Sequence, residues 1–299
     1  MARVKNFDQI TGNIGKLSFY TRKGSSEIFV RRKGGASKEK IKRDPAFANL
    51  RKVNKEFGGS AKMSKQIRMA FYGLEHVAEY NLAPAFSKLA HDILKTDTEN
   101  PTGERAISLS KFRYLLTGFD FSRSVRFSSL LRVPLSHSIL RSKQQAIVHI
   151  PSFACSFGLH VADTRGATYS KTPNASAYGH FRIIAALGIV TDMLLNPANQ
   201  TYEPVHDKLG QGFQTVSTPW YNTQTTVPEQ DLTLCLQSES SEGNTQTDTF
   251  THGTTAFKPN FTDADTLVLT VALEFGTPDA FGNTMPVRGA GGGMILGAI

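Results

Sequence analysis

The eight histidines are the side chains of this sequence best suited to metal binding or proton transfer, but their spacing does not favour either role. No two of them form an HxH or HExxH pattern. A carboxylate stands near a histidine in HVAD (160–163) and VHDK (205–208), yet in predicted strands or loops such neighbours are common by chance. We therefore expect no metal centre, no catalytic residue and no cofactor. The eight are His76, His91, His137, His149, His160, His180, His206 and His252.

Serine, glycine and cysteine give no catalytic pattern either. The sequence has no GxSxG nucleophile elbow, and GAGGG (289–293) lacks the Lys and the Ser or Thr of a phosphate-binding loop. A flexible connection or a closely packed terminal strand accounts better for this glycine run. Cys155 and Cys235 form no metal-binding spacing, and two buried free thiols are favoured over one long-range disulfide. These absences favour a protein that is not an enzyme.

The strongest chemical feature is a stretch dense in Lys and Arg, EIFVRRKGGASKEKIKRDPAFANL (27–50). Three interpretations are open. It can be a solvated helix face beside a charged edge strand, the cationic half of a contact between identical subunits, or a surface that binds nucleic acid. Phe19, Tyr20 and Phe29, interleaved with the basic residues on a predicted hairpin, resemble the aromatics of single-strand binders.

Charge is unevenly distributed along the 299 residues. The formal net charge is +11 over residues 1–80, +6 over 81–199 and −8 over 200–299, which gives +9 for the chain. A basic chain of this kind ordinarily indicates nucleic acid. A chain with a basic start and an acidic end can also complement a copy of itself, because opposite patches steer association.

The basic stretch begins in the second arm of a predicted β-hairpin over residues 13–33. Leu17 and Phe19 alternate with polar residues on one arm, Ile28 and Val30 do so on the other, and RKGSS between them suits a turn. An isolated hairpin is only marginally stable in water, so this one needs a sheet to join in its own subunit or in a neighbour.

Helical periodicity comes next, with helices expected at 45–57, 60–80 and 84–95. Asp44-Pro45 suits a helix start, and Gly58-Gly59 is expected to separate the first two helices. Three apolar stripes support them: Phe47, Leu50, Val53 and Phe57; Met63, Ile67, Phe71, Leu74 and Val77; and Phe86, Leu89 and Ile93.

From about residue 105 the sequence reads as short strands separated by turn residues. Strand-like runs include RYLLTGFDF, AIVHIPSF, HFRIIAALGIV, DLTLCLQS and TLVLTVALEFG. We therefore predict an α+β fold. Residues 1–36 form an N-terminal arm with the hairpin, 37–98 a small helical subdomain, and 105–299 a mainly antiparallel β-sandwich, jelly-roll-like or immunoglobulin-like.

The first twelve residues contain no apolar core of a secretory signal, and no apolar run approaches 18 residues. We expect cytoplasmic synthesis without a signal peptide and no membrane span, with assembly in the cytoplasm or outside the cell.

The N-terminal third resembles a large family of bacterial proteins. The pattern GNIGKLSFY…KGG.SKEKIKRDPAFANLRKVNKEFGGSAKMSKQIRMAF is similar to the start of hypothetical proteins from Bacteroidetes, specifically over about residues 10–72. The similarity is looser over LLTGFDFSRSVRFSSLL and GHFRIIAALG. It implies a hairpin, two helices, a β-rich second half and a bacterial or phage origin, and it brings no activity.

Our leading hypothesis is a structural protein that self-assembles through its N-terminal arm into a filament, tube or shell. The arm would dock on a copy of the chain, with its cations opposite acids of the C-terminal third. An alternative is a nucleic-acid-associated protein that uses the same arm on phosphates. The candidate interface residues are Leu17, Phe19, Ile28, Val30, Arg31, Arg32 and Lys33 on the arm, with Asp263, Asp265 and Glu274 as their partners.

Overall fold

The computed structural model describes residues 3–4, 10–22, 27–32, 34–159, 178–205, 212–236, 250–252 and 261–299. The chain forms two compact units, Met1–Arg51 and Lys52–Ile299. The predicted division into 1–36, 37–98 and 105–299 stays a prediction, and the helices after residue 52 share one apolar core with the β-sheet. The fold class is α+β with mainly antiparallel sheets, as predicted.

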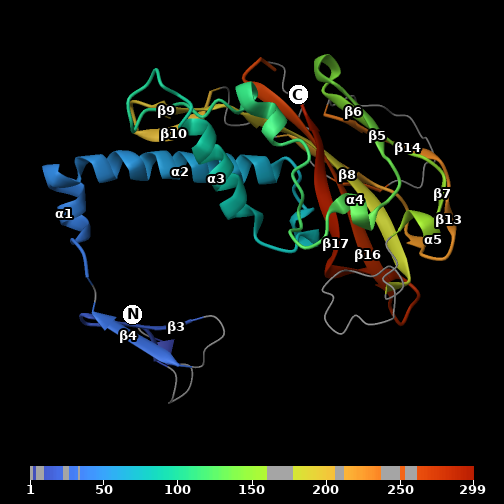
Figure 1. Cartoon of the computed structure of the whole chain (residues 1–299), viewed down its shortest axis with the longest axis horizontal. Coiled ribbons are helices and arrows are strands. Elements are labelled where there is room, and N and C mark those ends of the chain that lie inside the picture. The colour runs from blue at the N-terminus through green and yellow to red at the C-terminus, as the bar shows by residue number, and fades with distance from the viewer. Residues whose placement is uncertain are drawn as a thin grey trace. The chain divides into compact units, whose positions relative to one another are not determined.

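The first unit contains a four-stranded antiparallel sheet, which we call the arm sheet, followed by short helices (Figure 1). The predicted hairpin is present as β3 and β4, and it is extended by two strands of its own unit. Asp44 accepts a hydrogen bond from Ala46 N (2.9 Å) and caps the 3₁₀ turn that leads into α2. The elements are β1 Arg3–Val4, β2 Ile10–Ile14, β3 Leu17–Thr21, β4 Ile28–Arg32, α1 Lys38–Arg43 and η1 Pro45–Phe47.

The second unit is built on a six-stranded antiparallel sheet in the order β15-β11-β8-β16-β17, with β12 also paired to β8. The long strands β8 and β16 lie where the sequence predicts strands. The longest, β17, contains the glycine run GAGGG, for which the sequence left a flexible connection or a closely packed terminal strand open. The strands are β8 His180–Thr191, β11 Phe213–Ser217, β12 Tyr221–Asn222, β15 Phe250–His252, β16 Asp265–Pro278 and β17 Thr284–Ala298.

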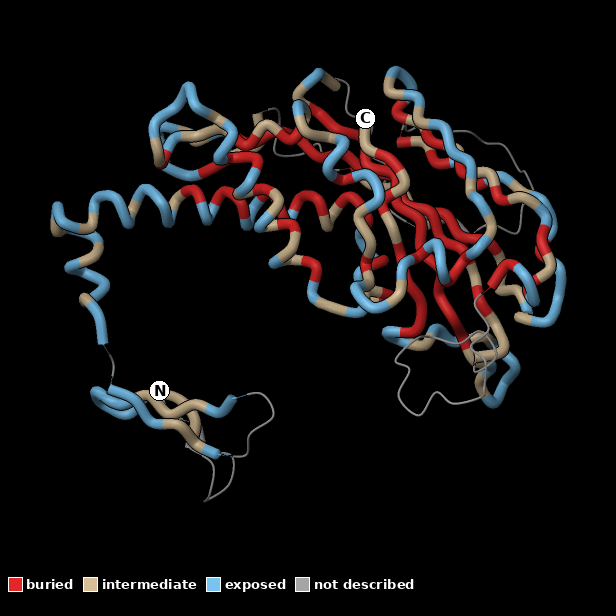
Figure 2. Tube along the Cα trace, in the orientation of Figure 1, coloured by how far each residue is buried: buried red, intermediate tan, exposed pale blue. Residues whose placement is uncertain are grey.

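Both faces of the central strands are buried (Figure 2). Along β16, Leu267, Leu269, Val271 and Leu273 enter one apolar core, as the alternation of the sequence predicts. Val268 and Ala272 enter a second core on the other face. The sheet is therefore the middle layer of three.

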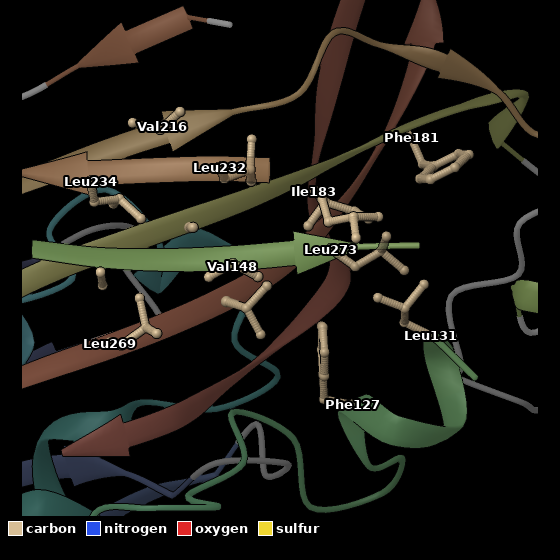
Figure 3. Packing of buried hydrophobic residues seen from close by; sticks show 14 of the residues in the cluster. Phe127, Leu131, Val148, Phe181, Ile183, Val216, Leu232, Leu234, Leu269 and Leu273 are labelled. Atoms are coloured by element: carbon tan, nitrogen blue, oxygen red, sulfur yellow. The ribbon is translucent and has the colours of Figure 1, made fainter. Parts of the chain in front are cut away.

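A three-stranded sheet covers the first face, in the order β14-β6-β5. Val148, Leu232 and Leu234 of this sheet pack with Ile183 and Leu269 of the central sheet (Figure 3). This pair of layers is the predicted β-sandwich. The strands are β5 Ser136–Leu140, β6 Gln145–Ile150 and β14 Gln230–Cys235, with the small pair β7 Phe153–Ala154 and β13 Thr226–Val227 nearby in sequence.

Helices cover the second face of the central sheet. The stripe of Met63, Ile67 and Phe71 is buried against it, and so are Phe86 and Ile93. The helical elements are α2 Ala48–Met69, η2 Glu75–Val77, α3 Leu82–Leu94 and η3 Leu109–Leu115, while α4 Phe127–Leu130, η4 Arg141–Lys143 and α5 Cys155–Gly158 are short. The two-stranded sheet β9 Met193–Asn196 and β10 Thr201–Pro204 completes this unit.

Three local predictions are wrong. Helix α2 continues through Gly58-Gly59 and ends at Met69. Leu50, Val53 and Phe57 of the first predicted stripe are exposed, by 41%, 41% and 62%, so this part of α2 does not bury its apolar side as predicted. The run RYLLTGFDF begins with 3₁₀ helix, which ends at Leu115.

Two adjacent glycines of α2, Gly58 and Gly59, differ in how much space surrounds them. A Cβ on Gly59 would lie 2.5 Å from the ring of Tyr202, whereas a Cβ on Gly58 would meet nothing within 4 Å. Gly59→Ala should lower the free energy of unfolding by about 1–3 kcal/mol through overpacking. Gly58→Ala should raise it by up to about 1 kcal/mol, because alanine is the better helix former. Urea unfolding of both variants checks this, and equal effects would contradict the packing of Tyr202 on α2.

Candidate interaction surface

The strand register of the arm sheet gathers the predicted apolar residues on one side. Phe19 pairs with Val30, and Thr21 pairs with Ile28, so Leu17, Phe19, Ile28 and Val30 share a face. Ile14 of β2 joins them opposite Leu17. We call these five residues the apolar face.

The apolar face is incompletely covered in the described part of its own unit. Val30 is 52% exposed, Ile14 49% and Leu17 39%, while Phe19 and Ile28 are half-buried. The helices α1 and η1 bury no residue at all. Among the described residues of this unit no apolar layer covers the sheet, and burial of the apolar face would stabilise it.

The opposite side of the arm sheet has a different composition. Tyr20 pairs with Phe29 across the strands, and their rings stack with centroids 5.8 Å apart. The guanidinium of Arg22 lies 4.4 Å from the Phe29 ring centre and that of Arg31 lies 5.5 Å from the Tyr20 ring centre. We call these four residues the aromatic face.

Strand alternation therefore separates the predicted basic residues. Arg31 belongs to the aromatic face, whereas Arg32 pairs with Leu17 and lies at the margin of the apolar face. Lys33 lies outside the described residues.

Two of the three predicted acidic partners are corrected by the structure. Glu274 and Asp265 are buried, and both interact with groups of their own chain. Asp265 accepts hydrogen bonds from the Thr191 hydroxyl (2.5 Å) and Thr262 N (2.9 Å). Only Asp263 is exposed, at 3.8 Å from Arg141. Sequence reasoning placed the other two outside because it could not show that both faces of β16 are covered.

Glu274 is the centre of a buried ionic cluster that the sequence did not reveal. Its carboxylate accepts hydrogen bonds from His76 Nε2 and from Arg182 Nε, the latter at 2.6 Å. Arg182 also lies over the ring of Trp220, at 4.6 Å. His76 is 198 residues from Glu274 in sequence, so no local motif could indicate the contact.

The cluster shifts the pKa of both ionisable partners. The hydrogen bond to Glu274 raises the pKa of His76 above its ordinary value, although partial burial opposes this. Burial disfavours the charged form of Glu274, but the hydrogen bond from His76 and the charge of Arg182 outweigh it and lower the pKa of that carboxyl. The pair is therefore ionised together and joins η2 to the central sheet.

Other candidate chemistry is sparse in the described ranges. There, no three His, Cys, Asp or Glu side chains lie close enough to hold a metal ion, and no helix is long and apolar enough to cross a membrane. Cys155 is buried, Cys235 is half-buried, and both are free thiols. Residues 160–163 of HVAD and 206–208 of VHDK lie outside the described part of the chain.

Comparison of the chain with protein-family models, curated proteins and solved structures gives no match. The resemblance of residues 10–72 to the Bacteroidetes proteins stays a prediction.

The ionic cluster predicts how stability depends on pH. Because the folded pKa of His76 is raised, its contribution is fully present below the unfolded value of about 6.5 and is lost as pH rises through the folded pKa. Because the folded pKa of Glu274 is lowered, its contribution is lost as pH falls through that value. His76→Gln should therefore reduce the loss of unfolding free energy between pH 6 and pH 9.

Glu274→Gln should cost roughly 3 kcal/mol at pH 6, because it leaves Arg182 and His76 facing a neutral amide. Denaturant unfolding at several pH values measures both effects. His137→Gln, at an exposed position of β5, is the control. A His76→Gln profile with the native slope would show that the cluster does not link pH to stability.

Proposed function

We propose that this protein is a non-enzymatic structural subunit that self-assembles through the apolar face of its arm sheet. The observation that carries the proposal is the register of β3 and β4, which places Leu17, Phe19, Ile28 and Val30 together on one incompletely covered face. Apolar side chains that are aligned and exposed on one face indicate a surface that binds a protein partner.

A copy of the chain is the partner that suits this surface best. The apolar face offers aliphatic and aromatic side chains, and full burial of one such side chain contributes about 1.5–3 kcal/mol. Val53 and Phe57 of α2, 41% and 62% exposed, add further apolar surface. Self-association would cover both without a second gene product.

Strand addition supplies the specificity of the proposed contact. β4 is an outer strand of the arm sheet, and β5 is an outer strand of the three-stranded sheet. Such edges present unpaired N–H and C=O groups that can bond another strand. If β4 of one copy adds to β5 of the next, the contact joins two different surfaces, and its repetition gives a helical filament, a tube or a shell.

The electrostatic part of the original hypothesis is weaker than the apolar part. Of the predicted acids only Asp263 is on the surface, because Asp265 and Glu274 are buried. Two exposed acids at the start of β14 in the same three-stranded sheet, Glu229 and Asp231, lie 3.7 Å and 2.7 Å from His149 of β6, the strand between β14 and β5. These acids would steer association more than they would strengthen it.

The double variant Leu17→Thr, Val30→Thr tests the apolar contact. Threonine keeps the strand propensity of these positions but removes apolar area, so the association constant should fall about 100-fold, at about 1.5 kcal/mol for each site. Sedimentation velocity and light scattering over a concentration series measure the assembly. The matched control Ser18→Thr, on the other side of β3, should assemble like the native chain.

Deletion of residues 1–35 should leave a folded second unit, because that unit has its own apolar cores. The shortened chain should stay monomeric, because it lacks the arm sheet. A native chain that is monomeric at every concentration tested would refute the proposed function. So would full assembly of the Leu17→Thr, Val30→Thr variant.

A further inference from the structure

We propose that the aromatic face of the arm sheet binds single-stranded nucleic acid. This site lies on the side of the sheet opposite the apolar face, so it does not rest on the proposed self-assembly. Its residues are Arg22, Phe29, Tyr20 and Arg31, in that spatial order.

The four side chains form a row across β3 and β4. Tyr20 and Phe29 are stacked at an interplanar angle of 28°, and a guanidinium lies against each of the two rings. A base has the same flat π-face as a guanidinium and can take its place over either ring. The displaced arginine is then free to pair with the adjoining phosphate.

The distribution of charge favours a polyanion. Residues 1–51 contain 13 Lys and Arg against 4 Asp and Glu, a formal net charge of +9. Residues 52–299 contain 21 of each, so the whole excess of the chain belongs to the first unit. Two ion pairs of that unit, Lys40–Asp44 at 4.0 Å and Arg43–Glu39 at 3.9 Å, lie on the surface of α1.

The shape of the site selects a single strand over a duplex. Stacking on Tyr20 or Phe29 needs a base whose face is open, whereas bases inside a duplex already stack on each other. The row also offers none of the amide side chains that read base edges, so binding should tolerate any sequence. Stacking on an aromatic side chain contributes about 1–3 kcal/mol per base.

Fluorescence anisotropy of the full-length chain with a labelled 12-nucleotide oligothymidylate tests the proposal, with a duplex of the same length as comparison. The native chain should bind the single strand at least tenfold more tightly than the duplex. Tyr20→Ile, Phe29→Ile keeps strand propensity but removes both rings, and it should weaken single-strand binding by tenfold or more. Phe19→Ile removes a ring from the apolar face instead and, as the matched control, should leave single-strand binding unchanged.

Arg31→Gln and Arg32→Gln remove the same charge from neighbouring residues on opposite sides of β4. Arg31→Gln should reduce the slope of log affinity against log salt by about 0.7, the value for one phosphate contact on a single strand, and Arg32→Gln should leave it nearly unchanged. Equal losses for the two arginines, equal binding of duplex and single strand, or no binding at low salt would each overturn the proposal.

Sedimentation of the same variants separates this site from self-assembly. Tyr20→Ile, Phe29→Ile should still assemble, which also shows that the arm sheet remains folded. Leu17→Thr, Val30→Thr should still bind oligothymidylate. If the two double variants each lose both properties, the two faces do not act as separate sites and the proposal fails.

Discussion

Burial of strands β8 and β16 on both faces is the constraint on which the second unit depends. Along β8, Ile183 and Leu187 enter one core while Ile184 and Val190 enter the other. Both faces therefore need a covering layer, and here helices cover one face and a second sheet covers the other. The end of α2 approaches β8 so closely that a Cβ on Gly188 would lie 2.3 Å from the backbone of Ala70. Glycine is therefore required at this position of β8. The position of α2 follows from that contact.

The same constraint decides where the acidic residues of the C-terminal third can act. A carboxylate on a strand that is covered on both faces must find partners in its own chain, since an unpaired buried charge is strongly unfavourable. Glu274 has His76 and Arg182, and Asp265 has Thr191 and Thr262. Two of the acids that give the sequence its negative end are therefore paired inside the second unit and do not act as surface charges.

The first unit is organised by a different rule, because its described residues form a four-stranded sheet and pack no further layer on it. Strand alternation sends Leu17 and Val30 to one side and Tyr20 and Phe29 to the other. Two chemically distinct surfaces thus arise within about fifteen residues of sequence. Self-association through one side and nucleic-acid binding through the other are compatible, since neither proposed partner needs the same side chains.

The sequence alone determined the elements that depend on local periodicity. Alternation in residues 266–276 gave the central strand with its inward leucines, and the spacing of Met63, Ile67 and Phe71 gave the buried stripe of α2. The same two-residue period predicted that Leu17, Phe19, Ile28 and Val30 share a face, because a hairpin register follows from its turn.

Only the tertiary structure decided which of these faces are covered. Gly58-Gly59 looked like a helix end, but Gly59 is where Tyr202 packs on α2. Glu274 looked like a surface partner for the arm, but it meets a histidine 198 residues away. Burial is set by residues distant in sequence, and a local pattern carries no information about them.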